Sequence, residues 1–177
     1  TYGLPVMLHV PREKRIADPG NIEDLLYISK YYPKAKIILA HAGRSYSPEI
    51  IRAGLEKLEG ANVWLEFSNV QSAEVVEEVF KRIPLEHLMY GSDIPVAVVR
   101  GTMFMLNGQR VALTRKPFPW SISGKPGQLR CTFMGYEQLR SMKRACDTLG
   151  FEEDEVQKLF YGNAKGLVEE FVKLVRG

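Results

Sequence analysis

Residues 36–44, KIILAHAGR, are the stretch from which the fold can be predicted. Four consecutive apolar residues at positions 37–40 predict a short buried strand, and His41 follows directly at its end. Gly43 allows the backbone to turn close beside the imidazole ring. A buried strand of a parallel sheet that ends in this way places a polar side chain at the end of the sheet where the carboxyl ends of its strands lie.

Three further apolar segments have the same character. Each is short and is separated from the next by a helical pattern; they are residues 4–9, 63–67 and 88–90. Strand and helix alternate at intervals of roughly 25 to 33 residues, which predicts βα units and a parallel sheet. We therefore expect an α/β fold in which residues 1–177 form a single domain, since 177 residues suit one core.

Polar side chains stand at the C-terminal ends of these expected strands. His9 ends the first, His41 the second and Asp93 the fourth, while Ser68 and Asn69 follow the third. In parallel βα barrels the chemistry is carried out at this end of the strands. Imidazoles and a carboxylate are ligands of zinc and similar divalent ions. A lone histidine at a strand end is more often a hydrogen-bonding residue, but three such ends in succession favour a site.

Capping residues and strand position give further expectations. Helices are expected to start at Asn21, Ser47 and Ser72, where a capping side chain precedes an apolar periodic pattern. His87 precedes its strand, so it is expected at the opposite end of the sheet in a structural role.

The alternation stops after Asp93, and residues 94–135 have a different composition. They contain six Lys or Arg residues and no Asp or Glu, in a chain whose net charge is only +3. Within them, MFML and QRVALT flank Asn107 and Gly108, a pair typical of a two-residue type I′ hairpin turn. We interpret residues 94–135 as an inserted hairpin and lid over the site; a solvated basic loop is the alternative.

The bulk composition limits the classes of partner. A net charge of +3 implies no nucleic acid, and no apolar run approaches the roughly 20 residues of a membrane helix. Two cysteines without a CxxC pattern predict reduced thiols and a cytoplasmic location. Because the chain begins at Thr1, close to a strand, we expect it to be a piece of a larger protein.

Four motifs, PVMLHV, KIILAHAGR, HLMYGSDIP and LFYGNAKGL, occur in this order and resemble the C-terminal half of the amidohydrolase superfamily. The resemblance is to the branch of aminocarboxymuconate-semialdehyde decarboxylase and related metal-dependent hydrolases, and it covers most of residues 4–167. It implies a TIM (β/α)₈ barrel in which the four strands are the fifth to the eighth, with a long insertion after the last strand.

The resemblance also implies roles for individual residues. His9 would be a metal ligand, and His41 would be a base, an electrophile or a ligand of a second metal. Asp93 would contact the metal and accept a proton from its bound water. The implied cofactor is a divalent ion, with Zn²⁺ as the first candidate. Arg12 and Arg44, together with the arginines of residues 94–135, are expected to bind the carboxylate of a small anionic substrate, because guanidinium pairs with carboxylate in a bidentate manner.

These residues predict a metal-dependent hydrolase in which metal-activated water attacks a small carboxylated or cyclic substrate, by hydrolysis or decarboxylation. The first-strand His-x-His pair implied by the resemblance has no counterpart, because no histidine precedes His9. We therefore expect the chain to associate with an N-terminal half or to form a homo-oligomer. The alternative is a non-catalytic half-barrel fragment or assembly module. A metal-free barrel such as an aldolase would need a lysine at a strand end, and none of the four ends has one.

Overall fold

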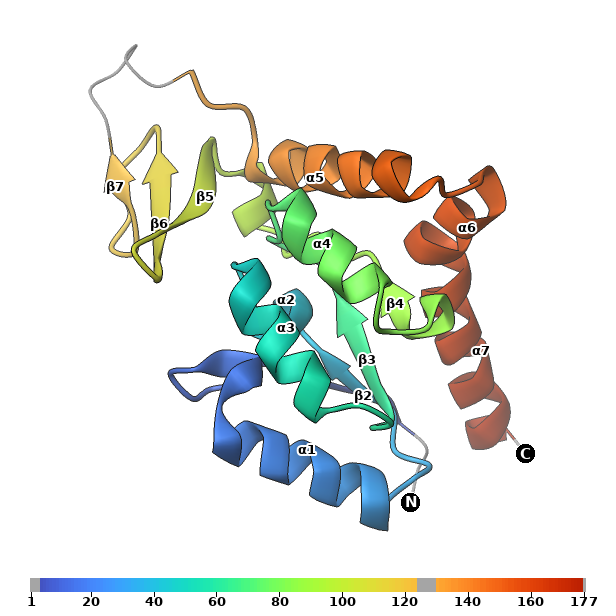
Figure 1. Ribbon diagram of the computed structural model, residues 1–177. Coiled ribbons are helices and arrows are strands. Elements are labelled where there is room, and N and C mark those ends of the chain that lie inside the picture. The colour runs from blue at the N-terminus through green and yellow to red at the C-terminus, as the bar shows by residue number, and fades with distance from the viewer. Residues whose placement is uncertain (1–3, 124–129, 177) are drawn as a thin grey trace.

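The computed structural model describes residues 4–123 and 130–176 (Figure 1). Lys125, one of the six cations of the inserted segment, lies outside the described residues. A four-stranded parallel sheet has the spatial order β1-β2-β3-β4. Its strands are β1 (Val6–Leu8), β2 (Ile37–Leu39), β3 (Val63–Glu66) and β4 (Leu88–Met89). The α/β fold with a parallel sheet is therefore confirmed, and sequence order equals spatial order.

One face of the sheet packs against the connecting helices, which lie in front of it in Figure 1. These are α1 (Pro19–Tyr31), α3 (Pro48–Lys57) and α4 (Ala73–Phe80), with the later helix α5 (Met134–Leu149) packed on α4. Every second residue of each strand points to this face. Leu39, Leu65 and Leu88 are paired neighbours on it, and all three are fully buried. The period-2 alternation of strands thus divides each apolar run between the two faces.

The opposite face is covered only in part. Ile38, Trp64 and Met89 form a small buried cluster with Leu167 of the C-terminal helix α7 (Asn163–Arg176). Met7, their counterpart on β1, remains 59% exposed. The other apolar side chains of α7 have little cover, since Val168, Leu174 and Val175 are each about 60% exposed.

The predicted structural role of His87, at the end of the sheet opposite His9 and His41, is confirmed. His87, within the 3₁₀ turn η2 (Leu85–His87), stacks on Trp64 with ring centroids 4.6 Å apart, and its Nδ1 lies 3.2 Å from the Val63 carbonyl oxygen. The Asn163 side-chain amide donates to the carbonyls of Leu85 and Leu88, both at 2.7 Å. Asn163 therefore joins α7 to β4.

The predicted helix starts are confirmed for α3 and α4 and wrong for α1. Ser47 and Ser72 accept hydrogen bonds from backbone N–H groups in the first turns of α3 and α4. Helix α1 instead begins at Pro19, capped by the Asp18 carboxylate. Proline suits a first helical position because its missing N–H needs no partner there. Asn21 is buried inside the helix and donates to the Arg15 carbonyl of the 3₁₀ turn η1 (Arg15–Ala17).

The inserted segment contains the predicted hairpin. After the 3₁₀ turn η3 (Val96–Val98), strands β5 (Gly101–Leu106) and β6 (Gln109–Thr114) pair antiparallel around Asn107 and Gly108. Both turn residues have positive φ, 50° and 76°, as a type I′ turn requires. A short strand β7 (Ile122–Ser123) adds to β6 in parallel, which the sequence did not predict.

The remaining elements come after α5. They are α6 (Glu153–Gln157) and the π-helical turn η4 (Lys158–Gly162), which leads into α7.

Cys131 and Cys146 are both free thiols, and burial raises the pKa of Cys146 to about 11. Among the described residues no helix is both long and apolar enough to cross a membrane.

Candidate functional site

The carboxyl ends of β1 and β2 bring two histidines together. The imidazoles of His9 and His41 meet edge to face, with their centroids 5.3 Å apart. The charge of Asp93 is close enough to act on the pKa of His9. His41 and Asp93 lie 32 and 84 residues beyond His9 along the chain, so the parallel sheet is what gathers the three side chains.

His41 lies in a left-handed turn, labelled α2 (His41–Arg44), at the end of β2. The φ angles of its four residues are 56°, 48°, 65° and 58°. Only one of the four is glycine, and each other residue in this conformation costs roughly 1–2 kcal/mol. The surrounding contacts must therefore hold the turn in place.

Glu66, at the end of β3, supplies the main contact and was missed in the sequence prediction. Its carboxylate is buried, with the residue only 4% exposed. It accepts three hydrogen bonds: from the backbone N–H of His41 at 3.2 Å, from the backbone N–H of Ser68 at 2.5 Å and from the Ser68 hydroxyl at 2.7 Å. An acidic residue inside an otherwise apolar strand, VWLEF, was the available signal.

The same network determines the protonated nitrogen of His41. Its Nδ1 lies 3.0 Å from the Ser68 carbonyl oxygen, which can only accept, and 2.8 Å from Ser68 Oγ. The Ser68 hydroxyl gives its own hydrogen to Glu66, so it also acts as an acceptor toward the ring. Nδ1 therefore carries the hydrogen, and Nε2 of the neutral ring keeps its lone pair.

Gly91 makes room for the Glu66 carboxylate. A Cβ at position 91 would overlap Glu66 Oε1, so the chain after β4 can pass over the carboxylate only as glycine. The Gly91 carbonyl accepts a hydrogen bond from the Gln138 side chain of α5 at 2.8 Å. Helix α5 thus holds the segment that leads to Asp93.

Asn69 and Asp93 are also held together. The Asn69 side-chain amide donates to the Asp93 carboxylate, and the Asn69 backbone N–H donates to Gln138 Oε1. Both residues have positive φ, 58° and 53°. The polar residues that follow β3 and β4 therefore form one network, anchored by a buried glutamine.

The two predicted substrate-binding arginines are engaged within the chain. Arg12 donates to Asn21 and to Asp24, whose hydrogen bond raises the pKa of the guanidinium, and so ties its loop to α1. Arg44 donates to the Val10 carbonyl at 3.1 Å, directly after His9. Arg44 therefore lies beside the site, and Arg12 lies at the start of α1.

A second group of arginines lies beside Tyr46. Arg110 belongs to the inserted segment, whose arginines were predicted to attract the substrate, whereas Arg15 was not predicted as part of the site. The guanidinium carbons of Arg15 and Arg110 lie 5.2 and 5.4 Å from the centre of the Tyr46 ring. Arg110 belongs to β6, so the hairpin reaches the strand ends. Burial and the neighbouring charges of Arg44 and Arg110 lower the pKa of Arg15, whose Nη1 is buried and has no hydrogen-bond partner among the described residues.

Gln71 fixes the hairpin in this position. Its Oε1 accepts hydrogen bonds from the Thr102 hydroxyl and the Met103 backbone N–H, both on β5, at 3.1 and 2.9 Å. Arg110 in turn contacts the Met103 sulfur at 3.2 Å. The inserted segment is therefore attached through defined contacts to the loop that follows β3.

The described residues do not complete a metal centre. No group of three or more His, Cys, Asp or Glu side chains in residues 4–123 and 130–176 could hold a metal ion. His9, His41 and Asp93 share one edge of the sheet, but a metal there would need donors from outside the described residues.

The comparisons with known proteins give the family. The model of the amidohydrolase family matches residues 1–168. The chain belongs to the amidohydrolase family. No curated protein sequence matches this amidohydrolase chain. Among solved structures, 4-oxalomesaconate hydratase (LigJ) from Rhodopseudomonas palustris matches it with a TM-score of 0.47 and 15% identity. The alignment covers 98% of this chain and 48% of that protein, so the chain spans about half its length.

A substitution at Gly91 tests the buried Glu66 of this amidohydrolase chain. We expect Gly91→Ala to lower the free energy of unfolding by about 1–3 kcal/mol, because the new methyl group must displace the carboxylate. Urea denaturation measures the change. Gly166→Ala is the matched control, since no atom lies within 4 Å of its Cβ and alanine favours the helix. Equal stability changes in the two variants would contradict the close approach.

The titration of His9 tests its electrostatic surroundings. Burial of the ring and then the charge of Arg44 lower the pKa of His9 below 6.5, whereas Asp93 raises it. NMR titration in the presence of a chelator should show His9 remaining neutral to a lower pH than a free histidine.

The sign of this shift fixes the pH dependence. Because the folded-state pKa is depressed, stability from neutral His9 is present above pH 6.5 and decreases as the pH falls through the folded-state value. Arg44→Gln should raise the pKa of His9, and Arg12→Gln should leave it unchanged. A His9 pKa that does not respond to Arg44→Gln would contradict the assignment.

Proposed function

We propose that this chain carries half of a hydrolase-type active site, in which His41 acts as the base toward a small carboxylated or cyclic substrate. The observation that supports this most is the hydrogen-bonded series from Glu66 through Ser68 to His41 Nδ1. In the neutral form of the ring, this series leaves the lone pair on His41 Nε2, at the carboxyl ends of the strands beside His9. A base needs such a lone pair within reach of the proton it takes.

Each further residue has a role in this proposal. His9 is neutral near pH 7 because its pKa is lowered, so it can donate a lone pair to a metal or a hydrogen bond to a substrate. Asp93, oriented by Asn69, is the second proton acceptor. The substrate carboxylate binds the arginines around Tyr46, of which Arg15 and Arg110 add to Arg44. Hydrolysis and decarboxylation both fit this arrangement.

A divalent ion, with Zn²⁺ as the first candidate, belongs to the proposal through family membership. When bound, such an ion would activate a water molecule and polarise a carbonyl group. The described residues alone are too few to hold it. We propose His9 as its first ligand on this chain, with Asp93 and His41 beside it.

The unpaired side of β1 supports the proposal that the four strands are the fifth to the eighth of a barrel. The described part of β1 pairs only with β2, and Leu4, Val6 and Met7 are each at least half exposed. A neighbouring parallel strand added there would bring its carboxyl end next to His9. We propose that an N-terminal half, or another copy of the chain, supplies this strand and the missing donors. A separate, non-catalytic assembly module is the alternative, favoured by the incomplete donor set.

Metal content and turnover distinguish the two. We expect this chain, assembled with the N-terminal half or second copy that supplies the missing donors and purified without chelator, to hold about one divalent ion per chain by mass spectrometry, and His9→Asn to reduce that content. His41→Asn should lower kcat by roughly 10²–10⁴ on a panel of small carboxylated and cyclic substrates. His87→Gln is the control, because His87 lies at the opposite end of its strand. Far less than one ion together with no turnover would favour the non-catalytic module.

The arginines around Tyr46 give an independent kinetic test. Arg110→Gln should raise KM for an anionic substrate about tenfold or more while leaving kcat within about twofold, because the guanidinium binds the carboxylate equally in ground and transition states. Arg140→Gln removes the same charge from an exposed ion pair with Glu137 and should change neither constant. An unchanged KM in Arg110→Gln would remove this arginine from the site.

A further inference from the structure

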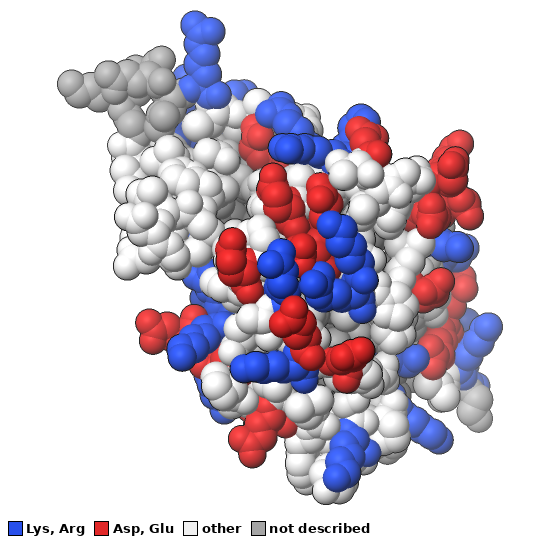
Figure 2. Space-filling view, in the orientation of Figure 1, with Lys and Arg blue, Asp and Glu red and all other residues white. Residues whose placement is uncertain are grey.

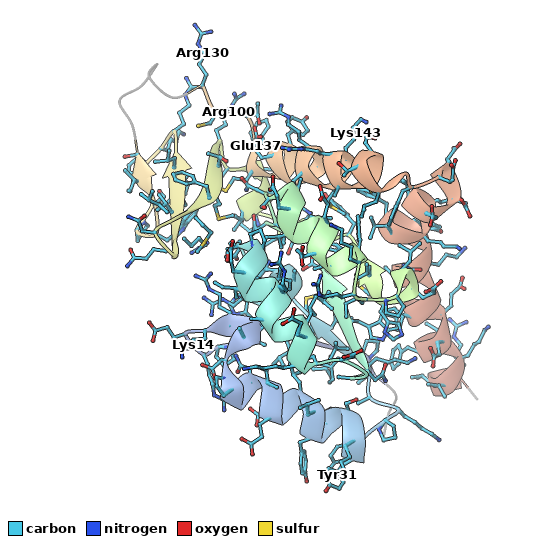
Figure 3. All side chains as sticks on the ribbon, in the orientation of Figure 1. Lys14, Tyr31, Arg100, Arg130, Glu137 and Lys143 are labelled. Atoms are coloured by element: carbon cyan, nitrogen blue, oxygen red, sulfur yellow. The ribbon has the colours of Figure 1, made fainter. Side chains whose placement is uncertain are left out.

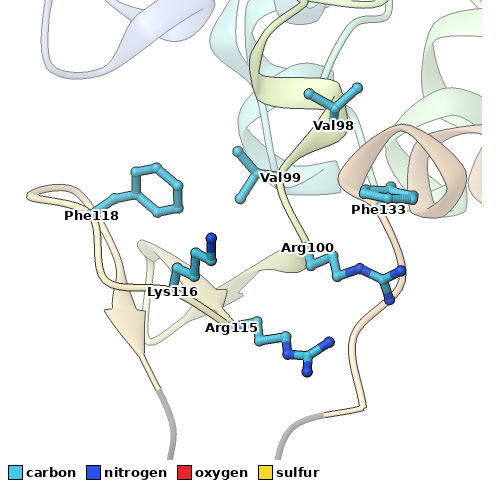
Figure 4. Close-up of a pocket in the computed structure, with 7 residues that line it drawn as sticks. All are labelled: Val98, Val99, Arg100, Arg115, Lys116, Phe118 and Phe133. Atoms are coloured by element: carbon cyan, nitrogen blue, oxygen red, sulfur yellow. The ribbon is translucent and has the colours of Figure 1, made fainter. Parts of the chain in front are cut away.

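A second concentration of positive charge lies away from the strand ends, at the base of the inserted hairpin. It lines a cavity of about 410 Å³ between the hairpin sheet and the start of α5 (Figure 4). Arg100, Arg115 and Lys116 provide its charge. Its apolar lining consists of Val98, Val99, Phe118 and Phe133. None of these residues belongs to the site at the strand ends.

Backbone hydrogen bonds hold the chain in place at Arg100 and Arg115. Arg100 lies between two neighbouring segments: its carbonyl accepts from the Arg115 N–H at 2.9 Å, and it forms a β-bridge with Phe133. The Val99 carbonyl accepts from the first N–H of α5, at Met134. Three segments of the chain, at residues 98–100, 115–118 and 133, therefore form the walls of one cavity.

The charge of this cavity is uncompensated within the described residues. Neither Arg100, Arg115 nor Lys116 forms an ion pair with a described acidic residue, and no acidic residue lines the cavity. Elsewhere acids and bases alternate: Figure 2 shows them interleaved over α3 and α4, where Arg52 and Arg82 both pair with Glu78. Figure 3 places Arg100 beside the start of α5, far from Lys14 on the η1 loop.

The aromatic groups add an apolar component. The Arg100 guanidinium lies 4.7 Å from the centre of the Phe133 ring, and Phe118 stacks on Trp120 with centroids 5.0 Å apart. A guanidinium on an aromatic ring keeps its outer N–H groups available for an anion. The volume is within the range of small-molecule sites.

We propose that this cavity binds a small organic anion, a phosphate monoester or dicarboxylate with an apolar body, at a site separate from the catalytic strand ends. The negative group pairs with the guanidinium groups of Arg100 and Arg115, which point to the same side in Figure 4, and Lys116 adds positive charge on the side of Phe118. The apolar body contacts the valines and phenylalanines. Two negative charges suit three cations better than one, and bidentate pairing favours planar or tetrahedral oxyanions.

Calorimetric titration with phenyl phosphate tests this site directly. We expect phenyl phosphate to bind more tightly than inorganic phosphate, which lacks the apolar body, and than benzyl alcohol, which lacks the charge. Binding should weaken in about 0.5 M NaCl because the cations are exposed. Binding should also change the fluorescence of Trp120, which stacks on a lining residue, and Trp120→Phe should abolish that signal.

Charge variants separate this cavity from other cationic surfaces. The variant R100Q/R115Q/K116Q should lose at least about tenfold in affinity while retaining its circular dichroism spectrum and thermal midpoint. The variant K14Q/K34Q removes exposed lysines elsewhere and should bind as the unmodified protein does.

The variant Arg110→Gln distinguishes the cavity from the arginines around Tyr46. It should bind phenyl phosphate normally if the cavity is the site. Loss of binding in Arg110→Gln with full binding in R100Q/R115Q/K116Q would overturn the proposal and assign the anion to the strand ends. No binding to the unmodified protein, or equal binding of phenyl phosphate and inorganic phosphate, would also overturn it.

Discussion

The buried carboxylate of Glu66 is the constraint on which the site depends. It accepts hydrogen bonds from the His41 and Ser68 backbones and from the Ser68 hydroxyl, so it acts on the ends of β2 and β3 together. A carboxylate removed from water costs several kcal/mol unless such donors replace the water. The first of these hydrogen bonds, from the His41 N–H, also holds the left-handed turn at the end of β2. The hydrogen bonds that satisfy the Glu66 carboxylate therefore also orient His41.

Gly91 extends this dependence to the fourth strand. Only a residue without Cβ can pass over Glu66, and Asp93 stands two residues later. In the sequence GSD, the glycine therefore lies against Glu66 and the aspartate places a carboxylate at the end of β4. Because Gln138 of α5 binds both Gly91 and Asn69, the helix after the insertion holds both strand ends in one arrangement.

Most features that depend on local sequence pattern were predicted correctly, with the start of α1 as the exception, whereas the side-chain contacts between distant residues were not predicted. The apolar runs located the strands at positions 37–39 and 63–66, and the pair Asn107–Gly108 located the hairpin, because only residues tolerant of positive φ suit that turn. The start of α1 was wrong because two capping patterns overlap there, and Asp18–Pro19 provides the better first turn. Glu66 was missed because an acid in a buried strand has no local partner: its donors lie 2 and 25 residues away.

The arginines illustrate the same limit. Arg12 and Arg110 carry the same charge. In the sequence Arg12 is followed by Glu13, and Arg110 has no acidic neighbour. In the folded chain Arg12 meets Asp24 across a loop, while Arg110 meets Tyr46 and Met103. Arg12 thus lies in an exposed ion pair with Asp24, whereas Arg110 forms no ion pair with a described acidic residue. Charge composition therefore predicts a basic segment, but only packing decides which cations face the strand ends and which face the cavity at the base of the hairpin.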